Sequence, residues 1–423
     1  MSANKTRARL EVQYPGESMH NLDEIVEFSY SSDVLSVGDV CTAKLVLGDG
    51  SILRKVRLGS EVKLYLANAA VNGGAWTLKH RGRVITADSD LDQGTVSLTM
   101  PDLGWHLVHC HPELHKRLRG LRLDQVVDPR AKHGLIDPTF GLTTVRAGKD
   151  ANKLTRYTKQ GKALVVAQAG KVLDQVQTVQ VEPGDTFFDI MVKYAQRENL
   201  LINVGIDGAI QAWNPDYERP PAFRFVNNST SSNVENAKRH DDATTRYTET
   251  VCVGEVVNLG VQLNDPLNPN ASKRKGRYRA KTDPKTGLPA PLPFTHRMNF
   301  GDGECFASDM AAKLAEWRWK RGMFDSHYLS VDVPDHYQIG ADGQGAWFES
   351  DLMASVDFTR LDATGPYYVA QVVCKSAVGD GDRTTLVLRW PHLLSASFGT
   401  WRTPTIYTSP ESNAAMQKGT VSS

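Results

Sequence analysis

The sequence predicts a mixed, β-dominated α+β fold in which two β-rich blocks flank a mixed middle. Short segments with an apolar residue at every second position recur near both ends of the chain, and this period places one face of a strand in a core. The 34 glycines and 20 prolines among 423 residues favour many turns. Two longer segments have instead the apolar period of a helix.

Composition restricts the class of function. With 49 Lys and Arg against 48 Asp and Glu, the formal charge is +1, which excludes a global attraction to nucleic acid or to an anionic membrane as the main activity. No secretory segment or bilayer-spanning stretch is visible, so we expect a soluble, unexported chain. The cysteines are odd in number and far apart, which argues against a disulfide framework and favours a reducing compartment. They are Cys41, Cys110, Cys252, Cys305 and Cys374.

The first block, residues 1–108, is predicted to be a small antiparallel β-barrel or sandwich. Apolar and polar residues alternate around Leu10–Tyr14, Cys41–Leu47, Val62–Leu66 and Val96–Met100. Glycine-rich turns separate these segments, as is typical of short antiparallel strands.

The middle block, residues 109–222, is predicted to mix helix and strand. A short helix is expected after Pro112, since proline suits the first helical turn. A longer helix is expected from Thr186 to about Glu198, where Thr186 and Asp189 resemble a capping box. A hairpin is expected to turn at Asp207-Gly208.

The last block, residues 223–395, is predicted to be β-rich again, with a tail at 396–423. Strands are expected at Tyr247–Val253, Tyr328–Val333, Leu352–Phe358, Tyr367–Lys375 and Thr384–Trp390. A helix over 304–321 is expected to bury Ala307, Met310, Ala311, Leu314 and Trp317 against the second barrel and to end at Gly322. The insertion 264–293 carries six prolines, and seven cations between Lys273 and Lys285.

A cluster of possible metal ligands lies at the boundary between the first and middle blocks: His106, His109, Cys110, His111 and His115. Its spacing does not match H-E-x-x-H, because Glu113 is two residues beyond His111, and no distant Cys/His pair completes a site. A domain junction with solvated histidines is the favoured interpretation, and a metalloenzyme is the open alternative. We therefore predict no metal and no cofactor.

Two further motifs fail their structural tests. Asp88, Asp90 and Asp92 imitate a calcium loop, but the glycine is one residue late and position 12 is Thr99, so a hairpin turn is favoured. Gly340, Gly343 and Gly345 neither follow an apolar strand nor open a helix, which excludes a dinucleotide fingerprint. No nucleophile elbow or P-loop is present. We expect no catalytic activity and assign no catalytic residue.

One segment suggests glycan binding. Val179–Ile190 combines a strand, a Pro-Gly turn and a capped amphipathic helix, like the opening of a LysM module. The later half of such a module is not recognisable after Leu201. The alternative function is therefore a peptidoglycan-binding or wall-degrading tail protein. The competing interpretation of this segment is an unrelated strand–helix corner that binds no glycan.

The order of several segments carries a wider resemblance. It rests on Glu27–Leu35, Gly59–Leu64, Arg81–Asp88, Gly184–Ile190, Asp207–Ile210, Asn228–Glu235, Thr245–Glu249, Ala311–Arg321, Val331–Pro334, Trp347 and Arg383–Pro391. In this order the chain resembles the baseplate or tail hub family of contractile-tailed phages, of the Mu-like type, and related injection machines. The 264–293 insertion and the His/Cys cluster depart from the family pattern.

This resemblance implies a structural role. Hubs of this family are homotrimers in which each chain contributes two related barrels, so that a ring joins a six-fold tail tube to a three-fold central spike. The implied partners are the tube, spike and tape-measure proteins and other baseplate proteins, with DNA only passing through the channel and no membrane. The implied location is the tail baseplate of the virion, assembled in the host cytoplasm, with a role in genome ejection. We expect the basic insertion to bind an acidic neighbouring tail protein, and the alternative interpretation is a plain solvated loop.

Overall fold

The computed structural model describes most of the chain outside parts of the middle block and the insertion. The described residues are 6–48, 50–112, 117–121, 136, 138–144, 153–157, 163–167, 177–180, 184–195, 201–213, 215, 217–254, 275–279, 292–302, 308–340 and 343–393.

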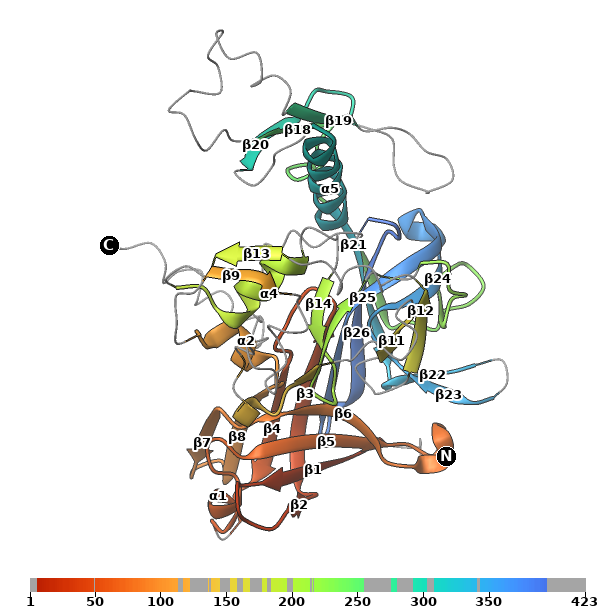
Figure 1. Cartoon of the computed structure of the whole chain (residues 1–423). Coiled ribbons are helices and arrows are strands. Elements are labelled where there is room, and N and C mark those ends of the chain that lie inside the picture. The colour runs from red at the N-terminus through yellow and green to blue at the C-terminus, as the bar shows by residue number, and fades with distance from the viewer. Residues whose placement is uncertain are drawn as a thin grey trace.

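One ten-stranded sheet runs through the body of the molecule (Figure 1). Eight of its strands follow one another in the order β17-β21-β26-β25-β3-β4-β8-β7, and β24 and β16 branch from β25. Along this path every strand is antiparallel to its neighbour. The strands are β3 (Ile25–Asp33), β4 (Val40–Val46), β7 (Thr86–Asp90), β8 (Thr95–Pro101), β16 (Phe223–Val226), β17 (Asn236–Asp241), β21 (His327–Pro334), β24 (Leu352–Phe358), β25 (Ala363–Ala377) and β26 (Gly381–Arg389).

This sheet joins the two ends of the sequence. β25 pairs with β3, so that Cys374 lies opposite Tyr30. The predicted boundaries at 108, 222 and 395 stay a prediction, but the sheet itself is continuous across the first and last blocks. The mixed, β-dominated fold that the sequence predicts is confirmed.

A second sheet lies across the lower end of these long strands (Figure 1). Its order is β2-β1-β5-β6, and its strands are β1 (Arg7–Gln13), β2 (His20–Leu22), β5 (Glu61–Ala67) and β6 (Thr77–Arg83). The alternation predicted around Leu10 and Val62 is observed, because Leu10, Val12, Val62, Leu64 and Leu66 are all buried in the main core. A short helix, α1 (Ile52–Lys55), and a 3-10 turn (Asn72–Gly74) lie between these strands in the sequence.

The middle block has a smaller core. It contains α4 (Phe187–Ala195), β14 (Leu201–Val204) and β15 (Ala209–Trp213), with β9 (Arg117–Leu121) paired to β13 (Gln177–Gln180), and α2 (Trp105–His109) joins it from the end of the first block. The capping box is confirmed: the Thr186 N–H donates to Asp189 Oδ2 at 2.8 Å, and the Asp189 N–H donates to Thr186 Oγ1 at 3.1 Å. The hairpin at Asp207-Gly208 is confirmed as β14–β15.

The helix expected after Pro112 stays a prediction, because the residues that follow this proline lie outside the described part. The helix here is α2, which ends at His109, and a strand begins at Arg117. Leu107 of α2 is fully buried in the smaller core. Residues 113–116 lie outside the described part.

The last helix, α5 (Ser308–Ser326), rises from the body with three strands beside it (Figure 1). These are β18 (Glu249–Gly254), β19 (Lys275–Arg279) and β20 (Arg297–Asp302), in the order β19-β18-β20. Ala311, Leu314 and Ala315 pack with Cys252 of β18, whereas Trp319, Met323 and Phe324 enter the main core. The expected packing of Leu314 on the second barrel is therefore corrected to this small sheet; Ala307 lies outside the described residues, as does the side chain of Met310.

The helix end at Gly322 is also wrong. The helix continues to Ser326, and Gly322 lies where a Cβ would meet the Thr245 carbonyl oxygen at 2.2 Å. Glycine is present here because the chain passes close to the helix, and it does not terminate the helix.

The remaining strands form small pairs. They are β10 (Thr143–Thr144) with β15, β11 (Lys153–Tyr157) with β12 (Ala163–Ala167), and β22 (Tyr337–Ile339) with β23 (Gly345–Trp347). Single 3-10 turns span Pro138–Phe140 and Thr359–Leu361. The C-terminal tail expected at 396–423 lies outside the described residues. No helix in the described ranges is both long and apolar enough to cross a bilayer.

Candidate functional site

Several strands of the eight-strand path have one buried and one polar face, whereas the central strand β25 is buried on both faces from Tyr367 to Cys374. On β21 the residues alternate strictly, so that Leu329, Val331 and Val333 are buried while the residues between them are half-exposed. β3, β4 and β26 show the same alternation. Because paired residues point to the same side of a sheet, the register brings the half-exposed residues together on one face.

Hydroxyl groups are frequent on this polar face. Thr42 lies opposite Ser29, and Thr385 lies opposite Asp332. The face also holds Ser31, Ser97, Thr99 and Ser330. Such a surface is wetted and offers no deep apolar contact.

Charges of both signs share this face. The carboxylates of Glu27, Asp88, Asp90 and Asp332 are interspersed with the cations of Lys44, Lys238, Lys375 and Arg383. Several are held locally: Asp332 accepts from Thr385 Oγ1 at 2.7 Å, and Arg383 Nε lies 3.0 Å from Glu235 Oε2. The face has no strong single sign that would retain a polyanion.

The two ends of the path are exposed edges. Among the described strands, β7 pairs only with β8 and β17 pairs only with β21. All residues of both strands are exposed, except the half-exposed Ala87 and Ala237. The β7 edge is acidic, with Asp88 and Asp90, whereas the β17 edge carries Lys238, Arg239, His240 and Asp241, of which Arg239 and Asp241 pair with each other.

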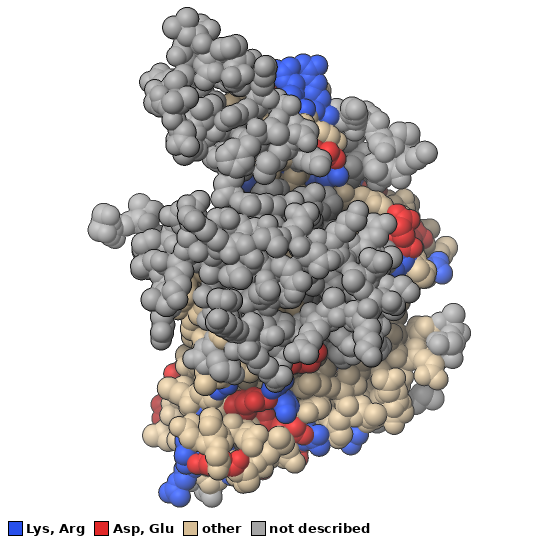
Figure 2. Space-filling model, viewed as in Figure 1, with Lys and Arg blue, Asp and Glu red and all other residues tan. Residues whose placement is uncertain are grey.

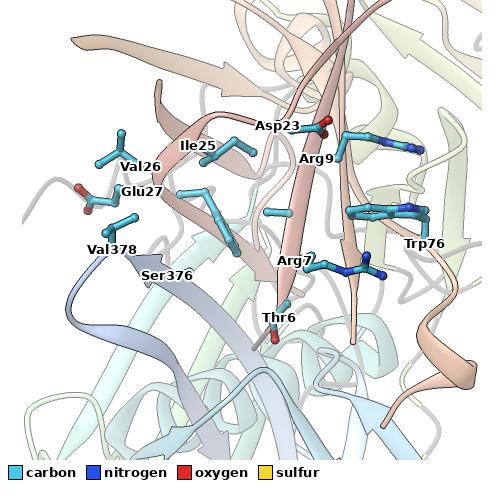
Figure 3. A pocket seen from close by; sticks show the side chains of 12 residues that line it. Thr6, Arg7, Arg9, Asp23, Ile25, Val26, Glu27, Trp76, Ser376 and Val378 are labelled. Carbon is cyan, nitrogen blue, oxygen red and sulfur yellow. The ribbon is translucent and has the colours of Figure 1, made fainter. Parts of the chain in front are cut away.

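A groove of about 480 Å³ lies between β1 and the lower end of the long sheet (Figure 3). The Trp76 ring lies between two guanidinium groups, with Arg7 at 5.3 Å and Arg9 at 4.7 Å from the ring centroid. Arg9 also pairs with Glu11 at 2.9 Å. Asp23 and Glu27 line other parts of the groove, so its charge is mixed as well.

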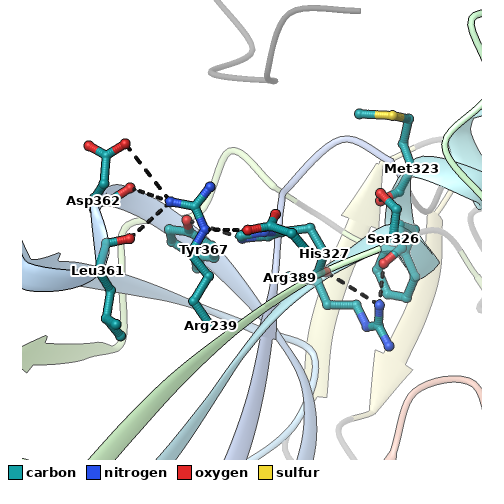
Figure 4. Close-up of polar contacts among 10 residues, drawn as sticks. Arg239, Met323, Ser326, His327, Leu361, Asp362, Tyr367 and Arg389 are labelled. Atoms are coloured by element: carbon teal, nitrogen blue, oxygen red, sulfur yellow. Dashed lines mark hydrogen bonds and ion pairs between the residues drawn. The ribbon is translucent and has the colours of Figure 1, made fainter. Parts of the chain in front are cut away.

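A polar junction connects β17, β21 and the end of α5 (Figure 4). Arg239 Nε lies 2.6 Å from Asp241 Oδ2, and its Nη1 donates to the carbonyls of Leu361 and Asp362. His327, which is buried and stacked on Trp390 at 3.8 Å, contacts Asp241 Oδ1 through Nδ1 at 2.8 Å. Burial lowers the pKa of His327 and outweighs the opposite effect of Asp241.

The end of α5 is held by a buried arginine. Arg389 Nη1 donates to the Phe324 carbonyl and, at 3.4 Å, to the His327 carbonyl, and its guanidinium lies over the Phe324 ring. A cation at this point satisfies carbonyls that a helix C-terminus leaves without intrahelical partners. The junction therefore fixes α5 on the long sheet and is structural.

One buried ion pair connects the first and last blocks, and one buried histidine lies within the last block. Lys79 Nζ on β6 lies 3.4 Å from Glu349 Oε1, and its side chain has no exposed surface. His336 is fully buried, bonds Thr384 Oγ1 through Nδ1 at 2.9 Å and lies 3.8 Å from Asp382 through Nε2. Burial lowers the pKa of His336 to about 4, against the opposing charge of Asp382.

The predicted His/Cys cluster does not converge on a metal site in the described part. His106 stacks on Phe140 at 4.7 Å, His109 packs on Trp105, and His111 Nδ1 contacts the Asp185 carbonyl at 3.1 Å. Cys110, between His109 and His111, is half-exposed. Across the described ranges no three His, Cys, Asp or Glu side chains are grouped for a metal ion, and His115 lies outside those ranges.

The other motifs take structural places. Asp88 and Asp90 lie on β7, whose hairpin to β8 is as predicted, and Gly345 opens β23. In the LysM-like segment, β13 pairs with β9 while β14 pairs with β15, so the strands on either side of α4 belong to different sheets. The polar face is not among the features predicted from the sequence, although the period of two around Thr42 and Lys44 is a signal for it.

The basic insertion is described only in part. Within β19, Arg277 and Arg279 pair with Glu249 at 2.8 and 3.1 Å, and Arg297 of β20 pairs with the same carboxylate at 2.5 Å. Burial acts to raise the pKa of Glu249, but these arginines outweigh it and hold the pKa below its usual value. In Figure 2, Lys and Arg side chains gather at the top of the molecule, while both signs are interspersed at the bottom.

Comparison with known proteins identifies the fold. No protein-family model and no curated protein matches the sequence. Among solved structures, the chain is similar to the tail protein from Neisseria meningitidis MC58 (16% identity, TM-score 0.63), covering 92% of this chain and 98% of that one. It is also similar to the 43 kDa tail protein of prophage MuSo2 from Shewanella oneidensis (13% identity, TM-score 0.64), covering 93% and 100%.

A third similar structure is the prophage tail protein gp18 from Listeria monocytogenes EGD-e, with 10% identity, a TM-score of 0.53 and coverage of 92% and 96%. The similarity to all three runs over nearly the whole length of both chains. The chain therefore has the fold of phage tail proteins, as its sequence resemblance to tail hubs predicted.

Proposed function

We propose that the chain is the structural hub of a phage tail baseplate, a homotrimer that joins a six-fold tail tube to a three-fold central spike. The observation that carries this proposal is the polar, charge-balanced face of a sheet that spans both β-rich blocks. If the two blocks act as related barrel domains, three chains present six similar units to the tube.

The polar face of the long sheet would then line the channel. Its buried face is covered by the chain's own core, whereas its polar face offers hydroxyl groups and charges of both signs. A lining of this kind lets DNA and the tape-measure protein pass without strong retention, because the two signs cancel over a short distance. DNA is thus a transient occupant and the role is non-catalytic.

The proposed partners are the tube, spike, tape-measure and other baseplate proteins, in a virion assembled in the host cytoplasm. The fold shared with tail proteins supports this location. The basic insertion is proposed to bind an acidic neighbour among these partners.

The experiment is to count the copies of this chain around the tail axis by electron cryomicroscopy of intact particles. Three copies enclosing a channel are expected, with the polar face toward the axis. Six copies, or a position on the periphery of the baseplate, would refute the hub. Saturable binding of the purified chain to peptidoglycan would instead support the wall-binding alternative.

A further inference from the structure

We propose that the groove beside β1 binds an extended acidic peptide, which adds to the open edge of β1 as a further strand and carries carboxylates at alternate positions. In the baseplate this peptide is a segment of a neighbouring tail protein. The inference rests on the proposed function only in that assignment, because binding in the groove requires no particular copy number.

The edge of β1 is open over its first three residues. On one side β1 pairs with β5 along its whole length, from Arg7 opposite Ala67 to Gln13 opposite Glu61. On the other side β2 pairs only with Leu10–Val12, and no other strand in the described ranges pairs with β1. Residues 7–9 thus present about 10 Å of strand edge to the groove.

The backbone groups of Ala8 point toward this open side. Successive residues of a strand direct their N–H and C=O groups to opposite sides. The Thr6 N–H donates to Asp382 Oδ2 at 3.2 Å and not to β5, so Ala8, two residues further on, also faces away from β5. Leu10 has the same orientation and lies opposite Leu22 of β2. A segment that follows β1 beyond the end of β2 can therefore pair with Ala8 through one donor and one acceptor.

The opposite wall of the groove is apolar and fixed in place. Ile25 and the buried Phe28 of β3 line it, and Val378, which is 69% exposed, lies at its rim (Figure 3). Ser376 Oγ donates to Asp382 Oδ1 at 2.6 Å, and the same carboxylate accepts from the Thr6 N–H, so this wall is tied to the start of β1. The volume of about 480 Å³ is within the range of about 300–1,000 Å³ that is typical of ligand sites.

Arginines at alternate positions select the side chains of the added strand. Arg7 and Arg9 lie on the outer face of the sheet, on either side of the Trp76 ring, whereas Ala8 between them packs against the main core. Paired strands direct their side chains to the same two faces in alternation. An added strand therefore places every second side chain beside the arginines and the others against the apolar wall.

Charge decides which side chains suit the outer positions. Among the described residues, Arg9 forms an ion pair with Glu11, whereas no carboxylate forms one with Arg7. Asp23 directly follows β2 and so lies nearer to Arg9 along the strand, and Glu27 lies on the other side of the groove (Figure 3). Because the indole ring holds the Arg7 guanidinium, a carboxylate of the added strand meets a cation that is already positioned for a bidentate contact. Strand addition of this kind gains affinity from the backbone and specificity from alternate side chains.

A labelled peptide of about nine residues with alternating Glu and Val tests the groove in the purified chain, with fluorescence anisotropy as the measurement. We expect saturable binding that is at least about fivefold tighter than that of the same peptide with Gln in place of Glu. A peptide with Pro in place of the central Val lacks a backbone donor and should also bind at least about fivefold more weakly.

Two variants locate this binding at the β1 edge. Ala8→Pro removes the N–H that faces the groove but no hydrogen bond to β5, and proline is tolerated at such an edge position. It should weaken binding by about fivefold or more while the melting temperature stays near that of the wild type. Arg7→Glu should weaken binding to a similar extent by like-charge repulsion, and it decides if Ala8→Pro does not fold. The matched control Arg54→Glu makes the same charge change on an exposed residue of α1 outside the groove and should bind like the wild type.

Photo-cross-linking identifies the occupant in assembled particles. With benzoylphenylalanine in place of Val378, we expect a cross-link to a segment of another tail protein that has at least two carboxylates at alternate positions. The control places the same amino acid at Leu58, which is 62% exposed but does not line the groove, and should not link to that segment.

The outcomes separate this site from the proposed function. Equal binding of the Glu and Gln peptides, or unchanged binding in both variants, would overturn the site and indicate an edge that is charged only to prevent pairing. No cross-link from position 378, or a cross-link to a second copy of this chain or to a segment without that pattern, would overturn the occupant. Three copies around the axis without peptide binding would leave the hub intact, whereas peptide binding in a particle with six copies would leave only the groove.

Discussion

Replacing Lys79 by methionine tests whether a buried ion pair holds the first and last blocks together. Lys79 lies on β6 and Glu349 follows β23, so the pair connects residues that are 270 positions apart in the sequence. The Lys79 side chain has no exposed surface, that of Glu349 is 8% exposed, and the two charged atoms are 3.4 Å apart. The Lys79 ammonium also lies 5.1 Å from the centroid of the Trp347 ring.

Methionine keeps most of the volume of lysine but leaves the Glu349 carboxylate buried without this cation. Breaking a buried pair by removing one partner typically costs about 3–5 kcal/mol, because an uncompensated charge stays in the interior. We expect Lys79→Met to lower the free energy of unfolding by this amount. Replacing both partners, as Lys79→Met with Glu349→Leu, should recover most of the loss.

Urea unfolding of the purified chain, followed by tryptophan fluorescence, measures both variants. The midpoint should fall in the single variant and return toward wild type in the double variant, with an unchanged slope. A loss below about 1 kcal/mol in the single variant, which is typical of exposed pairs, would refute the reasoning. So would a double variant that is no more stable than the single one.

Four further outcomes are expected. Leu314→Asp should lower the free energy of unfolding by several kcal/mol and reduce the soluble yield, because Leu314 is only 3% exposed and packs against β18. If this variant and the half-exposed control Arg318→Asp gave equal yields, this packing would be contradicted. Gly322→Ala should lower the melting temperature although alanine favours helix, because its Cβ would meet Thr245; an increase would refute the close approach. Because His336 resists protonation in the folded state, stability should fall by up to about 3 kcal/mol as pH drops from about 6.5 to about 4, with a shallower fall in His336→Gln. Neutralising Lys273, Arg274 and Lys275, which spares the arginines on Glu249, should weaken baseplate assembly most at low salt, whereas unchanged assembly would leave a plain solvated loop.

Local sequence was sufficient for several elements. The period of two around Leu10, Cys41 and Val62 predicted strands with one buried face, and the structure buries all three residues. Thr186 and Asp189 predicted a helix start that their hydrogen bonds confirm. These predictions succeeded because alternation, capping and turn chemistry depend on residues within a few positions of each other.

Predictions from local sequence failed where the structure depends on residues that are distant in the chain. Gly322 suits a helix end by sequence, but the chain near Thr245 approaches the helix there and requires glycine in its interior.

The candidate site shows the same division. The sequence by itself determined that Thr42 and Lys44 share one face of a strand and that Asp88 and Asp90 share a face of another. Only the tertiary structure decided that these faces form one surface, because β3 pairs with β25 more than 300 residues later in the chain. Strand order depends on which buried strand faces pack together in the core. Because the strands that pair are far apart in the sequence, no local sequence pattern indicates which ones will pair.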